Sequence, residues 1–60
     1  MNIDAVKEYL RIDDDADDII IGIMIDAAKE YIKDAVGRCD EENPKTKLLF
    51  YTLMQDFYEN

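Results

Sequence analysis

The segment from Ala16 to Val36 constrains the fold most, because its apolar residues follow the helical repeat along two lines. At about 100° per residue, one apolar stripe consists of Ile20, Met24, Ala27, Tyr31 and Ala35. A second apolar stripe, about 100° around the helix, consists of Ile21, Ile25, Ala28, Ile32 and Val36. A surface helix of a small bundle needs an apolar arc of only about 100°. We therefore expect a long central helix whose two stripes contact different neighbours.

Two shorter helices are expected on either side of this segment. The first covers residues 4–11 with Asp4 as its N-cap, and the aspartate cluster at residues 13–18 marks the start of the central helix over residues 16–36. Gly37 is expected to end that helix, and Asn43-Pro44 begins a third helix that runs to residue 58. The predicted fold is a single all-α domain over residues 1–60, a three-helix bundle with no strand. Its expected core consists of Val6, Leu10, Ile20, Met24, Ala27, Tyr31, Leu49, Leu53 and Phe57.

The short chain and its apolar composition together predict self-association. A chain of 60 residues buries only about 60% of its unfolded surface, yet 48% of these residues are hydrophobic. If the flanking helices cover only the first stripe, the second stripe is left open for other copies of the chain. The expected oligomer interface consists of Ile21, Ile25, Ala28, Ile32, Tyr51 and Tyr58. The alternative is that both stripes are core within one subunit, with both flanking helices wrapped around the central one.

The net charge of −8, from 15 acidic and 7 basic side chains, argues against a protein that grips nucleic acid. Domains that bind DNA tightly carry a basic footprint. We expect no sequence-specific binding of nucleic acid. An acidic surface could still face DNA as a channel wall does, or the charge could serve only to keep an apolar chain in solution.

Catalytic, cofactor and metal sites are not expected. The chain has no histidine and no serine, its glycines are isolated, and Cys39 is its single cysteine. The aspartate cluster starts like a calcium loop, but Asp18 stands where that loop needs glycine and Met24 where it needs glutamate. The longest apolar run, residues 19–25, is too short to span a membrane.

Three segments resemble one protein family. VKEYLRID at residues 6–13, AAKEYI at residues 27–32 and YEN at residues 58–60 are similar, in order and spacing, to the small head–tail connector (adaptor, or head-completion) proteins of long-tailed bacteriophages. Phe57 stands where relatives often have tryptophan. The chain also stops where relatives usually continue, so it is expected to be either a compact version or a chain that lacks a C-terminal segment.

The resemblance implies a structural virion protein without enzymatic activity or cofactors, made in the cytoplasm of a bacterial host. Such proteins form a homo-oligomeric ring beneath the portal after DNA packaging. They extend the DNA channel and dock the next connector or tail protein. The alternative from the charge is a small acidic helical DNA mimic that inhibits a basic protein, and a regulatory helical adaptor of cellular origin is a third possibility. Self-association separates the first two, because a mimic is a monomer or dimer.

Overall fold

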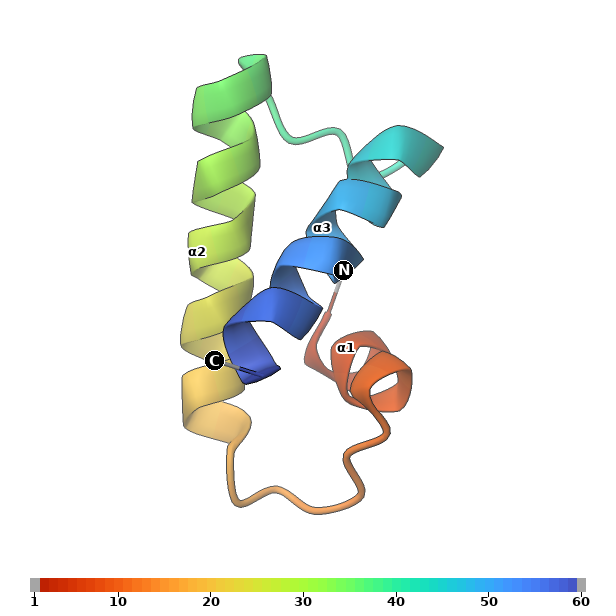
Figure 1. Cartoon of the computed structure of the whole chain (residues 1–60), viewed down its shortest axis with the longest axis vertical. Coiled ribbons are helices and arrows are strands. Elements are labelled where there is room, and N and C mark those ends of the chain that lie inside the picture. Colours follow the sequence, from red (N-terminus) through yellow and green to blue (C-terminus); the bar gives the residue numbers. More distant parts are fainter. Residues whose placement is uncertain (1, 60) are drawn as a thin grey trace.

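Three α-helices make up the fold in the computed structural model, which describes residues 2–59. They are α1 (Ile3–Leu10), α2 (Asp18–Val36) and α3 (Pro44–Glu59). No strand occurs within the described residues, so the predicted all-α bundle is confirmed. Figure 1 shows α3 running back alongside α2 and the short α1 near the lower end, and every pair of helices is in contact. With 19 residues, α2 is the longest helix, but α3 with 16 is nearly as long.

The ends of α1 are set by backbone geometry. Asn2, rather than the predicted Asp4, is the N-cap, and its Oδ1 atom accepts a hydrogen bond from the Ala5 N–H at 2.8 Å. At the other end Arg11 takes a left-handed conformation with φ 61°. The next N–H, that of Ile12, then donates to the Lys7 carbonyl at 2.8 Å. This reversal stops the helix and brings Ile12 against the core.

Three other helix ends have local causes. The helix α2 begins at Asp18, two residues later than predicted, because Asp14 Oδ1 accepts from the Ala16 N–H at 3.2 Å and holds a turn there. It ends, as predicted, at Gly37, whose φ of 97° suits a residue without a side chain. Asn43 caps α3 as predicted, since its Oδ1 atom accepts from the Lys45 N–H at 2.8 Å.

The core lies where α1 and α3 meet one side of α2. The buried side chains are Val6, Ile21, Met24, Ile25, Ala28, Ile32, Phe50 and Met54. Partly buried residues packed around them are Ile3, Leu10, Ile12, Cys39, Leu49, Tyr51 and Leu53. Val6 and Met24 were predicted core residues, whereas the predicted Leu10, Leu49 and Leu53 form its edge. Phe50 and Met54 fill the centre on α3.

The assignment of the two stripes of α2 is wrong. The second stripe supplies most of the core residues of α2, although its Val36 is exposed. In the first stripe Met24 is buried as predicted, but Ile20, Ala27 and Tyr31 are exposed. The second stripe is the more hydrophobic of the two, with three isoleucines and a valine, but the helical repeat alone does not say which one faces inward. The rotation of α2 follows from packing, because α1 and α3 lie together on the side of Ile21, Ile25 and Ile32. Phe57, also predicted as core, is 36% exposed at the end of α3.

Candidate interaction surfaces

An apolar stripe on α2 is left uncovered by the bundle. Figure 1 shows α1 and α3 on one side of α2 and no helix on the other. Ile19 is 85% exposed, Ile23 is 57% exposed and Tyr31 is 55% exposed. Together with their exposed neighbours they form what we call the outer stripe: Ile19, Ile20, Ile23, Ala27 and Tyr31. Large apolar side chains in such a continuous row are typical of a surface that contacts another protein.

The predicted interface residues are mostly inside the subunit. Ile21, Ile25, Ala28 and Ile32 are buried. The prediction that the second stripe of α2 lies open on a single subunit is therefore wrong. The alternative, in which both stripes are core within one subunit, is also wrong, because most of the first stripe is exposed. Tyr51 is half-buried, and Tyr58 is 39% exposed. The outer stripe is visible in the sequence as an apolar row, but only the packing shows that it is the free one.

A shallow groove continues the outer stripe onto α3. It lies between the start of α2 and the end of α3, and its lining residues are Asp17, Ile20, Met24, Phe57 and Tyr58. Ile20 belongs to both the groove and the outer stripe. The exposed apolar surface therefore continues from the start of α2 onto the C-terminal end of α3.

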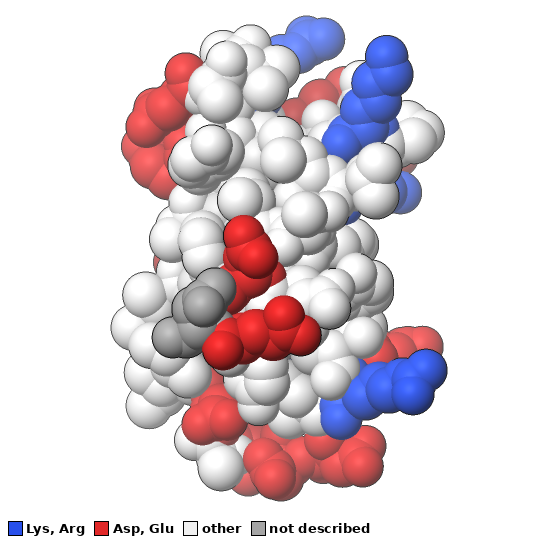
Figure 2. All heavy atoms as spheres, viewed as in Figure 1, with Lys and Arg blue, Asp and Glu red and all other residues white. Residues whose placement is uncertain are grey.

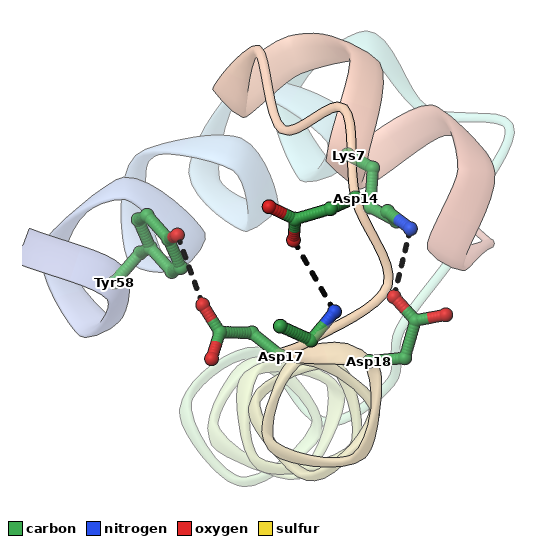
Figure 3. A network of polar contacts seen from close by, with 6 residues as sticks. Lys7, Asp14, Asp17, Asp18 and Tyr58 are labelled. Atoms are coloured by element: carbon green, nitrogen blue, oxygen red, sulfur yellow. Dashed lines mark hydrogen bonds and ion pairs between the residues drawn. The ribbon is translucent and has the colours of Figure 1, made fainter.

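Aspartates of the acidic cluster hold the helices together at this end (Figure 3). Lys7 Nζ on α1 lies 2.8 Å from Asp18 Oδ1, an oxygen atom that solvent does not reach. The Tyr58 hydroxyl on α3 donates to Asp17 Oδ2 at 3.2 Å. The cluster therefore acts as a structural junction of all three helices.

These contacts shift two pKa values. The hydrogen bond to Asp18 raises the pKa of Lys7 above 10.5, against a smaller effect of desolvation, and the nearby Asp15 and Asp14 charges add to it. Desolvation raises the pKa of Tyr58 above 10.0, and the hydrogen bond to Asp17 acts in the same direction. Both groups therefore hold their protons more tightly in the folded chain.

A second junction joins α1 to α3. The Tyr9 hydroxyl donates to Gln55 Oε1 at 3.1 Å. The rings of Tyr9 and Tyr51 have centroids 4.9 Å apart and are inclined at 37°. Tyr51, one of the predicted interface residues, thus already has an aromatic partner within the subunit.

The charge of the protein is concentrated in one half. Residues 27–50 contain five basic and five acidic side chains, so this half is neutral, whereas the remaining residues contain two basic and ten acidic side chains. Figure 2 shows the lower end, where the loop between α1 and α2 lies, crowded with acidic side chains. The first half of the outer stripe and the groove lie in this acidic half, which carries the whole net charge of −8.

Within residues 2–59, no group of three or more histidine, cysteine, aspartate or glutamate side chains is arranged to hold a metal ion. No helix of that part of the chain is both long and apolar enough to cross a membrane. Cys39 is a free thiol, half-buried beside the core.

Comparison with known protein families gives a match over most of the chain. A family model described as "Phage gp6-like head-tail connector protein" matches residues 1–54. Neither the curated proteins nor the solved structures contain a match to the chain. The family match includes α1, α2 and most of α3, and so it covers both the core and the outer stripe.

Proposed function

Because the chain belongs to the phage gp6-like head–tail connector family, we propose that copies of it assemble into a ring at the head–tail junction, beneath the portal. Membership makes it a structural component of the phage virion, and this family is not a class of enzymes. The proposed partners are further copies of the chain, the portal, and the tail or second connector protein that docks next. The protein is made in the cytoplasm of the bacterial host and becomes part of the virion.

The outer stripe of α2 carries the proposal. Three isoleucines and a tyrosine between 48% and 85% exposed lie on one helix face without a partner in the subunit. A monomer in water rarely leaves such a row open, since covering apolar surface contributes about 25 cal/mol for each Å² buried. A ring subunit has this surface covered in every copy.

The acidic half supports a role beside DNA. Ten acidic side chains against two basic ones repel phosphate groups. A channel lined by such a surface lets packaged DNA move, because it offers few cations to hold the backbone. We propose that part of this half faces the channel of the ring.

The test is assembly on the portal. The purified chain is mixed with portal rings or with DNA-filled heads that lack the connector, and its incorporation is followed by native mass spectrometry and electron microscopy. We expect many copies to bind as a closed ring. A chain that stays monomeric alone and with portal, and instead binds one basic protein tightly, would favour the acidic mimic.

A further inference from the structure

Resting on the proposed self-assembly, we infer that the outer stripe of α2 docks onto the surface of α3 around Lys45 and Leu48 in a second copy of the chain. The contact is head-to-tail: Ile23 of one copy meets Leu48 of the next. Each copy then offers one surface of each kind. Repeating such a contact yields a closed ring if the rotation between neighbours closes, and a filament if it does not.

Charge disfavours the simplest alternative, a symmetric pairing of two outer stripes. Ile19, Ile20 and Ile23 lie in the half that carries the net charge of −8. A symmetric dimer through these residues would place two such halves against each other, and like charges across an interface are strongly unfavourable. The occupant of the outer stripe should therefore be a neutral or basic surface with an apolar centre.

The start of α3 is a surface of that kind. Leu48 is 71% exposed and second only to Ile19 among the large exposed hydrophobic side chains. It lies in the neutral half of the chain, and the exposed Lys45 is three residues before it on the same helix face. Glu41 in the preceding loop lies 3.8 Å from Lys29, so part of the acidic charge near this surface is already offset.

The charged residues around the two hydrophobic centres are opposite in sign. Asp26 and Glu30 follow Ile23 by three and seven residues, so they lie beside it on α2, and both are exposed. Lys45 lies beside Leu48. With the apolar side chains in contact at the centre, the carboxylates and the ammonium group fall at the rim. Rim ion pairs contribute little affinity each, but they select one register over others.

Disulfide trapping tests the pairing directly. In a Cys39→Ser background, Ile23→Cys and Leu48→Cys are made as separate chains, and mild oxidation is applied to each alone and to their mixture. We expect a cross-linked dimer between the two different variants and little product from either alone. Efficient cross-linking of Ile23→Cys with itself would show a symmetric contact and overturn the inference, while the proposed connector function would stand.

A charge exchange provides the second arm. Glu30→Lys and Lys45→Glu should each weaken self-association about threefold to tenfold, and the double variant should regain most of that loss. Glu8→Lys on α1 makes the same change in net charge as Glu30→Lys, away from both surfaces, and serves as the control for that variant. If wild-type chains oligomerise but neither reversal has an effect beyond that of the control, the pairing is wrong. If wild-type chains oligomerise neither alone nor on the portal, the proposed function fails with it.

Discussion

The ammonium group of Lys7 lies 2.8 Å from Asp18 Oδ1 and so links α1 to the first residue of α2. The contact crosses the loop that contains most of the aspartate cluster. The aspartate cluster, although it starts like a calcium loop, therefore connects helices through contacts of its own side chains. Asp14 holds the turn, Asp17 binds Tyr58 and Asp18 binds Lys7.

The first prediction is a loss of stability above about pH 10. The pKa values of Lys7 and Tyr58 are both raised in the folded chain, from 10.5 and 10.0. For each group the folded state binds the proton more tightly than the unfolded state. The stabilisation that this gives is fully present below the ordinary pKa of the group, and it is lost as the pH rises through the raised pKa of the folded chain. Urea unfolding between pH 8 and 11 should show this fall. It should be shallower in Lys7→Gln and in Tyr58→Phe, and unchanged in Lys33→Gln.

The second prediction separates the two stripes of α2. Ile25 is 7% exposed within the core, so Ile25→Asp should place a carboxylate without a partner among apolar side chains and unfold the chain. Ile23, 57% exposed, should tolerate the same change with little loss of helix content while self-association weakens. Circular dichroism and analytical ultracentrifugation of the two variants check this. A folded Ile25→Asp chain would contradict the burial of the second stripe.

The third prediction concerns α3. Phe50 is fully buried, and Phe50→Ala should cost about 3–5 kcal/mol of unfolding free energy. Leu53 lies at the edge of the core, so Leu53→Ala should cost less, about 1–2 kcal/mol. Denaturant titrations at one protein concentration give both values. Equal losses at the two positions would show that Leu53 is as central as the sequence pattern predicts.

The fourth prediction uses the two glycines, which should respond with opposite signs. A side-chain carbon added at Gly22 meets no atom within 4 Å, so Gly22→Ala should stabilise α2 by about 0.5–1 kcal/mol through helix propensity. Gly37 also has open space, but its φ of 97° strains any side chain. Gly37→Ala should therefore destabilise the chain by about 1–2 kcal/mol. Thermal unfolding of both variants measures the difference, and a stabilising Gly37→Ala would contradict the left-handed helix end.

The positions of the three helices can be predicted from the sequence, because the residues that start and stop a helix act on neighbouring backbone groups. Gly37 and the Asn43-Pro44 pair act on neighbouring backbone groups, and both helix ends lie where the pattern predicts them. The N-cap of α1 is a local feature too, but Asn2 and Asp4 are both capable of it, and the hydrogen bond from Ala5 selects Asn2. The resemblance of residues 6–13 and 27–32 to connector proteins likewise needs only the sequence.

The inward face of α2 depends on the tertiary structure. Two apolar rows lie about 100° apart on one helix. The second row contains more isoleucine and valine, which favours its burial, but the helical repeat alone does not assign either row to the core. The choice is made by groups distant in sequence: Lys7 reaching Asp18, and Phe50 and Met54 packing in the same core as Ile21 and Ile32. A helical repeat states that a face is apolar, whereas only the neighbours that fill the space beside it decide whether that face becomes core or remains open for another subunit.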